Sequence, residues 1–252
     1  MTADRNSAVE KQKNNPDVRP SAQNIPAKPE DFPGTPPRPR SFATGFSKAF
    51  LKDYHSGVMQ YTYKGVPCLK SPIDLAIYML AIWERKPGTI VEIGSFQGGA
   101  AHFYYDLTRN YGLSTDIITV DFRDIRSAGQ ETTGPVEFIQ ADALNLAESD
   151  LHERLKTAPR PWLVIEDSAH TFAVTHAVMM YFKDRMETGE LLIIEDGVIE
   201  DQGGNWRYDG GPNRAVHEFF EQHPDVFGIV ERYNDFFGKN VSFNPNGYLE
   251  KQ

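Results

Sequence analysis

Apolar and polar residues follow a pattern that predicts helices and strands in turn from residue 73 onward. Five short, largely apolar stretches have the length of buried strands. They are TIVEIG from Thr89, DIITVD from Asp116, VEFIQAD from Val136, WLVIED from Trp162 and ELLIIED from Glu190. Apolar residues at helical spacing precede the first strand over 72–85, where Pro72 suits a first helical turn. Further helices are predicted over 97–112 and 170–186.

The connections between these strands are mostly a dozen residues or longer. A hairpin does not span such a connection, so we expect parallel strands joined by right-handed crossovers, with helices on both faces. After Asp196 the pattern changes to a loop over 197–213, a helix over 214–223 and two strand-like pieces around 227–233 and 240–244. The chain therefore predicts a doubly wound, mostly parallel α/β sheet.

The first 40 residues differ in composition from the rest. They hold eight of the 17 prolines, among Lys, Asn, Glu and Ser with few large apolar residues. Such a segment does not bury enough apolar surface to offset the entropy lost when it is ordered. We expect a disordered Pro-rich tail over 1–40, an N-terminal helical or lid segment over 41–72, and the main domain over 73–252.

The charge and cysteine content exclude several classes of protein. A formal net charge of −9 argues against a nucleic-acid partner, which needs clustered Lys and Arg. The single cysteine, Cys68, excludes an intramolecular disulfide, and no stretch has the apolar length of a membrane span or signal peptide. We therefore expect a cytoplasmic protein that binds neither nucleic acid nor membrane.

The stretch VEIGSFQGG follows the first strand and opens a helix. Its backbone N–H groups are expected to face a pocket at the carboxyl edge of the sheet. Gly94, Gly98 and Gly99 permit a tight turn and a close approach of a ligand. Asp121 ends the next strand, where an acid can accept hydrogen bonds from both hydroxyl groups of a ribose. These residues predict a nucleoside site.

The glycine spacing and one buried acid bear on which nucleoside is bound. The spacing G-x-x-x-G-G differs from the G-x-G-x-x-G that brings a backbone against a pyrophosphate. Glu92 would repel a phosphate, but it suits the ammonium or sulfonium of S-adenosylmethionine. Asp142 is placed for the adenine, and Ser95 and Ala143 are further candidate contacts with this cofactor. The alternative is that the glycines only shape a turn and that Asp121 and Asp142 cap exposed loops.

Three carboxylates are expected at the same edge of the sheet. Asp167 ends the fourth strand, and Glu195 and Asp196 end the fifth. Adjacent parallel strands lie about 4.8 Å apart, so these side chains should converge beside the cofactor turn. Protons or a hard cation must neutralise them, and oxygen ligands suit Mg²⁺, or else Mn²⁺ or Ca²⁺. The alternative for Glu195 and Asp196 is a pair of solvated loop acids, which Asp167 on the neighbouring strand argues against.

His170 follows Asp167 by three residues, at the start of the predicted helix over 170–186. A helix N-terminus disfavours the imidazolium form, so His170 is expected to be a neutral base. Asp167 and His170 are the candidate catalytic residues. His176 and His217 lack acidic partners on their predicted helix faces, and we interpret them as ordinary surface or core residues.

With these residues placed, the chain resembles a family of class I S-adenosylmethionine-dependent methyltransferases, the one that joins rhamnosyl and macrolide-sugar O-methyltransferases to cephalosporin hydroxylase. The matching segments occur in order over 65–252. They are GVPCLKSPIDLAIY, VEIGSFQGGAA, IEDSAHTFAVTHAV, LLIIEDG, and GPNRAVHEFFEQHPDVF through SFNPNGYLEK. The resemblance implies a Rossmann-like methyltransferase domain over 73–252. Ala100 departs from the family, which more often has Ser there; this affects one cofactor hydrogen bond and not the fold.

The resemblance also implies a site and an activity. Mg²⁺ is expected to be bound by Asp167, Glu195 and Asp196, and His170 is expected to deprotonate an acceptor hydroxyl. The implied reaction moves the methyl group of S-adenosylmethionine to a sugar hydroxyl of a glycosylated natural product, as in antibiotic biosynthesis. The resemblance further suggests a homo-oligomer, with 41–64 in its interface. We expect the loop over 197–213 to form a lid, with Trp206 and Tyr208 against a sugar face.

Two other functions stay open. Within the same family, the protein could act with a partner on a β-lactam nucleus, as a tailoring protein of the hydroxylase type. From a different class, it could be a non-catalytic nucleoside-binding subunit that docks on another enzyme through its tail, although the retained site residues disfavour this. A methyl-transfer assay on a panel of glycosides, with and without EDTA, separates the three.

Overall fold

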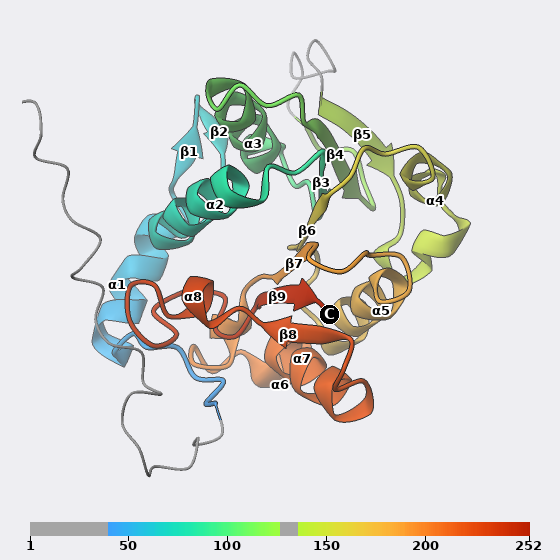
Figure 1. Ribbon diagram of the computed structural model, residues 1–252. Coiled ribbons are helices and arrows are strands. Elements are labelled where there is room, and N and C mark those ends of the chain that lie inside the picture. The colour runs from blue at the N-terminus through green and yellow to red at the C-terminus, as the bar shows by residue number, and fades with distance from the viewer. Residues whose placement is uncertain (1–39, 127–135) are drawn as a thin grey trace, which may run out of the picture. The chain divides into compact units, whose positions relative to one another are not determined.

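All five predicted strands are present, side by side in one sheet (Figure 1). They are β3 (Thr89–Ile93), β4 (Asp116–Asp121), β5 (Val136–Gln140), β6 (Trp162–Glu166) and β7 (Leu191–Ile194). The computed structural model describes residues 40–126 and 136–252. The expected tail over 1–40 therefore lies, apart from Arg40, outside the described residues. Residues Ser41–Gln252 form one compact unit.

The strand order is β5-β4-β3-β6-β7-β9-β8, and the first five strands are parallel, as the long connections predict. β9 (Tyr248–Lys251) runs antiparallel to both of its neighbours, β7 and β8 (Phe227–Ile229). The chain continues from β3 to β4 on one side, and β6 pairs with β3 on the other. The carboxyl ends of β3 and β6 are therefore a topological switch point, where such sheets bind ligands. The predicted doubly wound, mostly parallel sheet is confirmed.

Successive residues of the strands point into two hydrophobic cores, one on each face of the sheet. In β6, Leu163 and Ile165 join one core and Val164 joins the other. The first core is covered by α2 (Pro72–Arg85), α3 (Gly99–Asn110) and α8 (Glu231–Asn234). The second is covered by α4 (Asp150–Leu155), α5 (Phe172–Phe182) and α7 (Gly211–Gln222). No helix within 40–126 or 136–252 is both long and apolar enough to cross a membrane.

Local capping sets where the helices begin. α2 starts at Pro72 because Ser71 is its N-cap, and Ser71 Oγ accepts the Asp74 backbone N–H at 3.3 Å. α5 begins two residues later than predicted, because Thr171 is its N-cap and accepts the Val174 N–H at 3.4 Å. His170 has a φ of 55°, a conformation that an α-helix does not contain, so it precedes the helix.

The segment before α2 contains α1 (Lys48–Val58) and a short hairpin of β1 (Thr62–Tyr63) and β2 (Val66–Pro67). Leu51 and Val58 of α1 form a small core with Val198 and Phe243 from the C-terminal half. The predicted helical segment over 41–72 is thus helical only in part, over α1. Its role as a lid and the boundary at residue 72 stay predictions.

The prediction of a strand over 240–244 is wrong, because the last strand is β9. The side chains of Asn240, Ser242 and Asn244 are all buried, so the polar residues of this stretch do not form the exposed face of a strand. Asn240 donates to the Ser41 carbonyl at 2.7 Å, and Ser242 donates to a carboxylate of α2 at 2.5 Å. The segment over 197–213 is also more regular than expected, with the 3₁₀ helix η3 (Gly197–Ile199) and α6 (Asn205–Tyr208).

Asp74 links α2 to the C-terminal segment. Its buried carboxylate accepts from Ser242 Oγ at 2.5 Å, the Phe243 backbone N–H at 2.9 Å and the Tyr248 hydroxyl at 2.8 Å. Burial raises the pKa of Asp74, and these donors oppose that rise. Removing the carboxylate would leave all three buried donors without their acceptor.

Replacing Asp74 by Ala should lower the free energy of unfolding by about 3–5 kcal/mol. Hydrogen bonds to a charged group contribute about 1.5–3 kcal/mol each, and the relieved cost of burying the carboxylate offsets part of their sum. Urea denaturation followed by circular dichroism measures this loss. The matched control is Asp53→Ala on the exposed side of α1, which should change the stability little. A loss for Asp74→Ala as small as that of the control would mean that Asp74 does not hold the C-terminal segment.

Candidate active site

The predicted acids meet at the carboxyl edge of β3, β6 and β7, which are neighbours in the sheet. They border a cavity of about 540 Å³ whose walls include the turn after β3, the segment after β6, part of α1 and the segment around α6. The predicted site residues that line it are Glu92, Gly94, Ser95, Gly99, Asp167, His170 and Asp196. One cavity thus joins the predicted cofactor turn to the predicted metal and base residues.

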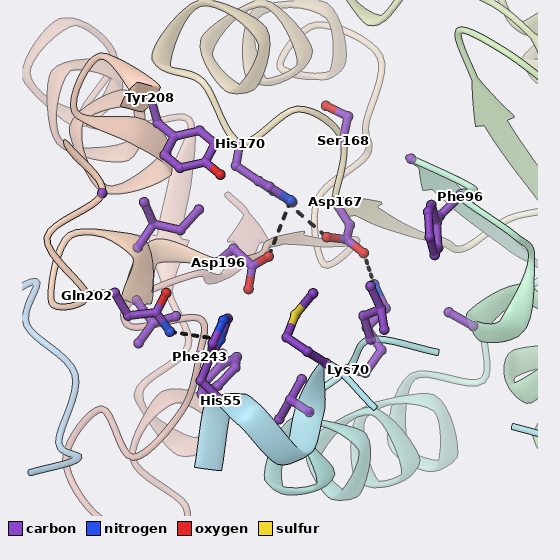
Figure 2. Close-up of a pocket in the computed structure, with 18 of the residues that line it drawn as sticks. His55, Lys70, Phe96, Asp167, Ser168, His170, Asp196, Gln202, Tyr208 and Phe243 are labelled. Carbon is purple, nitrogen blue, oxygen red and sulfur yellow. Dashed lines mark hydrogen bonds and ion pairs between the residues drawn. The ribbon is translucent and has the colours of Figure 1, made fainter. Parts of the chain in front are cut away.

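Asp167, His170 and Asp196 lie together in this cavity (Figure 2). One ligand atom from each residue lies within 4.8 Å of the others. His170 Nε2 is 3.4 Å from Asp196 Oδ2, and His170 Nδ1 is 4.0 Å from Asp167 Oδ1. The exposed fractions of the three side chains are between 21% and 28%. The arrangement offers two accessible carboxylates and an imidazole beside them.

The backbone at two of these residues is strained. His170 and Asp196 have left-handed conformations, with φ of 55° and 58°. Such a conformation costs about 1–3 kcal/mol for a residue other than glycine and persists only where the surroundings hold it. The Asp196 backbone N–H donates to Asn244 Oδ1 at 3.0 Å, and His170 is followed directly by the N-cap Thr171. The fold therefore keeps both side chains turned toward the same point.

Glu195 lies outside this group of three. Its Oε1 accepts from Lys70 Nζ and from the Tyr78 hydroxyl, both at 2.5 Å. Burial and the charge of Asp167 raise the pKa of Glu195, against the effect of Lys70. Asp167 and Asp196 converge beside His170, as expected. Glu195 is linked to Asp167 through Lys70, which contacts both carboxylates. The metal-binding role of Glu195 stays a prediction.

Lys70 is a site residue that the sequence reasoning misses. It lies between β2 and α2, and only 2% of it is exposed. Its ammonium contacts Asp167 Oδ2, lies 2.5 Å from Glu195 Oε1 and is 3.6 Å from Glu92 Oε1. Burial lowers the pKa of Lys70, but the charges of Asp167 and Glu195 outweigh burial and hold that pKa well above its usual range. Lys70 is therefore a buried cation shared by three carboxylates.

The turn after β3 lies against the segment that follows β6. Gly94 has a φ of 107°, and a Cβ there would lie 2.0 Å from the Asp167 carbonyl oxygen. Glycine is thus required where two chain segments cross. Glu92 Oε2 accepts from Thr119 Oγ1 at 3.1 Å, and the same hydroxyl lies 2.5 Å from Ser95 Oγ. Burial raises the pKa of Glu92 to about 7.

The remaining predicted cofactor residues, Gly98, Asp121, Asp142 and Ala143, lie outside the described lining of the cavity. Asp121 Oδ2 accepts the Phe96 backbone N–H at 2.9 Å, so it supports the cofactor turn. Asp142 accepts the Leu144 N–H at 2.9 Å and caps the 3₁₀ helix η2 (Ala143–Glu148), as the capping interpretation expects. The cofactor roles of these four residues stay predictions.

Another wall of the cavity comes from α1 and the segment around α6. His55 Nδ1 lies 3.0 Å from Gln202 Nε2 (Figure 2). Trp206 is 87% exposed, and the Tyr208 ring meets the His170 ring edge-on at a centroid distance of 6.3 Å. The sequence reasoning does not identify His55 or Gln202, because no local pattern connects residues 147 positions apart.

Glu166 is buried directly behind the site, at the end of β6. Its Oε1 accepts from Ser168 Oγ at 2.7 Å, and its Oε2 has no hydrogen-bond partner among the described residues. Burial raises the pKa of Glu166 from 4.5 to about 7, against the effect of the Ser168 hydrogen bond. The folded protein therefore keeps the proton of this side chain to a higher pH than the unfolded chain does.

The sheet is parallel except for one reversed strand, and acids cluster at its switch point. This is the architecture of Rossmann-like proteins, which bind their ligands at the carboxyl edge of the sheet. A family model described as Rhamnosyl O-methyltransferase/CmcI matches residues 55–252. The chain belongs to this family, as the sequence resemblance predicts.

Individual relatives agree with this assignment. The rhamnosyl O-methyltransferase of Mycobacterium tuberculosis (strain ATCC 25618 / H37Rv) is 26% identical over 212 residues, covering 81% of this chain and 85% of the relative. That of Mycobacterium leprae (strain TN) is 27% identical over 192 residues, covering 75% and 82%. A solved Mg–SAM structure of CmcI is 26% identical, with a TM-score of 0.61 over 87% of this chain and 89% of CmcI. These matches confirm the class I methyltransferase fold and support an S-adenosylmethionine-dependent O-methyltransferase.

Replacing Glu166 by Gln should change how stability depends on pH. Because the pKa of Glu166 is raised from 4.5 to about 7 in the folded protein, the unfolded chain releases this proton first, and stability falls as pH rises through that window. Gln has no proton to release. The unfolding free energy of Glu166→Gln relative to the unsubstituted protein should rise by about 2.5 kcal/mol between pH 5 and pH 8. Urea denaturation across this range measures the difference.

Glu148→Gln, at an exposed position of η2, is the matched control. Its stability relative to the unsubstituted protein should change little over the same pH range. A flat difference for Glu166→Gln as well would contradict the raised pKa of Glu166.

Proposed function

We propose that the protein transfers the methyl group of S-adenosylmethionine to a sugar hydroxyl of a glycosylated small molecule, with a divalent cation at the site. One observation carries the proposal: His170 lies beside two carboxylates, Asp167 and Asp196, in the cavity that also contains the turn after β3. Methyl transfer requires the donor carbon and the acceptor oxygen to meet in line at close range. A single cavity for cofactor and base satisfies that requirement.

The cofactor is assigned to the carboxyl ends of β3 and β4. Bound S-adenosylmethionine supplies a methyl group that its sulfonium already activates. Glu92 and the turn at Gly94 are suited to the amino-acid end, because both line the cavity and the buried carboxylate of Glu92 can attract the ammonium group of the cofactor. We assign the ribose to Asp121. Phe122 is 64% exposed and Leu144 is 50% exposed near these positions, and they offer apolar surface for the adenine.

Asp167 and Asp196 fit a hard divalent cation. One ligand atom from each of Asp167, His170 and Asp196 lies within 4.8 Å of the other two, and all three residues line the cavity. Carboxylate oxygens are the ligands that Mg²⁺ prefers. Glu195 is retained as a third candidate ligand through the family resemblance, although its carboxylate contacts Lys70. The related CmcI structure is described with Mg and SAM, which supports this choice of cation. When bound, the cation lowers the pKa of a coordinated acceptor hydroxyl.

His170 is assigned as the general base. An imidazole is a poorer ligand for Mg²⁺ than a carboxylate, so His170 is better suited to accept the hydroxyl proton than to bind the cation. Asp196 lies 3.4 Å from Nε2, close enough to stabilise the imidazolium that forms, and the Tyr208 ring packs against the imidazole. These contacts orient the ring while it holds the proton.

The acceptor is assigned to the wall formed by α1 and α6. Rhamnosyl O-methyltransferases are among the relatives, which supports a sugar as the methylated group. Trp206 and Tyr208 present aromatic surface to a sugar face, and the His55–Gln202 pair offers hydrogen-bonding groups to its hydroxyls.

A methyl-transfer assay on a panel of glycosides, with and without EDTA, tests the proposal. Transfer that is abolished by EDTA and restored by Mg²⁺ is the expected result. Transfer that EDTA leaves unchanged would overturn the metal role. Binding of S-adenosylmethionine without transfer to any glycoside would favour a tailoring protein that needs a partner or a non-catalytic subunit.

Asp121→Ala should weaken binding of S-adenosylmethionine by about 2–4 kcal/mol, because an acid that accepts two ribose hydroxyls loses two charge-assisted hydrogen bonds. Isothermal titration calorimetry measures the affinity. Asp124→Ala, at a nearby exposed position, is the matched control and should bind the cofactor as the unsubstituted protein does. Unchanged affinity in Asp121→Ala would remove Asp121 from the cofactor site.

Asp167→Asn and Asp196→Asn should weaken Mg²⁺ binding and nearly abolish turnover while S-adenosylmethionine still binds. His170→Ala should keep the cation but slow transfer by roughly 10²–10⁴-fold, with partial recovery at high pH as hydroxide replaces the base. Steady-state kinetics and Mg²⁺ titration measure both effects. His217→Ala on the exposed face of α7 is the control, and full activity of Asp167→Asn in EDTA would eliminate the metal-dependent mechanism.

A further inference from the structure

Lys70 reaches the carboxyl ends of three adjacent strands from a loop outside the large sheet. Glu92 belongs to β3, Asp167 follows β6 and Glu195 follows β7, and these strands are neighbours in the order β3-β6-β7. The Lys70 ammonium contacts Asp167 Oδ2 and lies 2.5 Å and 3.6 Å from the carboxylates of Glu195 and Glu92. A single side chain thus ties the cofactor strand to both strands that carry the candidate metal ligands.

The balance of charge at this edge depends on Lys70. Four carboxylates gather there, from Glu92, Asp167, Glu195 and Asp196. Arg207 is the other Lys or Arg in the described lining of the cavity, and it is exposed. The buried ammonium offsets part of this negative charge and leaves the rest to attract a cation.

Lys70 also determines which oxygens remain accessible. It contacts Asp167 Oδ2, so the other oxygen, Oδ1, is the one that faces His170 Nδ1 at 4.0 Å. It shares Glu195 Oε1 with the Tyr78 hydroxyl. Asp196 has no contact of this kind with Lys70 among the ion pairs of the described residues, and its carboxylate is 28% exposed.

We propose that Lys70 is a positioning residue and internal counter-charge: it holds Asp167 Oδ2 and Glu195 Oε1, leaves the other oxygens of these two residues and Asp196 for a divalent cation, and limits how tightly that cation binds. This inference rests on the metal site of the proposed function. A bound cation that is held less tightly can exchange, and the carboxylates keep their places through the lysine whether or not the cation is bound.

Two opposing effects decide what the removal of the lysine charge would do. A divalent ion and a unit charge in the same site, at an effective dielectric constant of ~20, repel each other enough to change a binding constant by several orders of magnitude. The loss of supporting hydrogen bonds around metal ligands usually weakens binding by about 10–100-fold. The charge effect is larger, so a neutral residue at position 70 should bind Mg²⁺ more tightly, by about tenfold or more.

Titration of the full-length protein with MgCl₂ by isothermal titration calorimetry tests this directly. Lys70→Met, which keeps the length of the side chain without the charge, should bind Mg²⁺ at least about tenfold more tightly than the unsubstituted protein. Lys70→Arg keeps the charge and should stay close to the unsubstituted affinity. The matched control is Lys64→Met, which removes a 66% exposed lysine paired with Asp106 and should leave the affinity unchanged.

The outcomes separate this inference from the metal site itself. If the unsubstituted protein binds Mg²⁺ and Lys70→Met binds it equally or more weakly, Lys70 is not a counter-charge, and the metal site stands. If neither protein binds Mg²⁺, both the metal site and the role of Lys70 are overturned. Tighter binding is a result that simple damage to the fold would not produce.

Loss of the folded state in Lys70→Met would still give a test. The double variant Lys70→Met, Glu195→Gln removes one positive and one negative charge, so it should recover the thermal stability lost by the single variant, as measured by differential scanning calorimetry. Failure to recover would mean that the lysine acts through packing and would overturn the inference.

Discussion

Several carboxylates are brought to one edge of a parallel sheet, and a buried charge without a partner is costly. The ammonium of Lys70 compensates three of these carboxylates, those of Glu92, Asp167 and Glu195. The loop that carries Lys70 must therefore dock on the sheet edge. α2 begins immediately afterwards, with Ser71 as its N-cap and Pro72 in its first turn. The position of Lys70 in the site therefore also fixes where α2 begins.

The same edge brings the parts of the site together. Gly94 leaves room for the carbonyl of Asp167, so the cofactor turn lies directly against the strand that carries the candidate base and metal residues. On the other side, Asn244 accepts the backbone N–H of Asp196, and the segment around Asn244 is held to α2 by Asp74. Stability and site geometry therefore depend on overlapping contacts, and a loosened C-terminal segment would also release Asp196.

The sequence predicts the parts of the structure that follow from periodicity. Buried strands and long crossovers specify a parallel sheet, and residues just after such strands meet at one edge, which is why Asp167, His170 and Asp196 could be placed together. The pattern over 240–244 misleads, because the polar side chains there are buried and bond to other segments, Asn240 to the Ser41 carbonyl and Ser242 to Asp74. The strand pattern also does not resolve the separate directions of Glu195 and Asp196, since Asp196 has a left-handed backbone.

Lys70 could not be found in this way. It lies in a loop, 97 residues from Asp167 and 125 from Glu195, and no local rule of spacing relates them. The sequence shows only a lysine just before the helix α2. Its role can be recognised only when the strand order places Asp167 and Glu195 beside it.

The location of the divalent cation tests the proposed site most directly. Crystals of the protein grown with S-adenosylhomocysteine and Mn²⁺ allow the ion to be located by anomalous scattering. We expect one strong anomalous peak within coordination distance of Asp167 and Asp196, in the same cavity as the cofactor, with the imidazole of His170 beside it. A cavity with bound S-adenosylhomocysteine and no such peak, or a peak at a different group of residues, would contradict the proposed site.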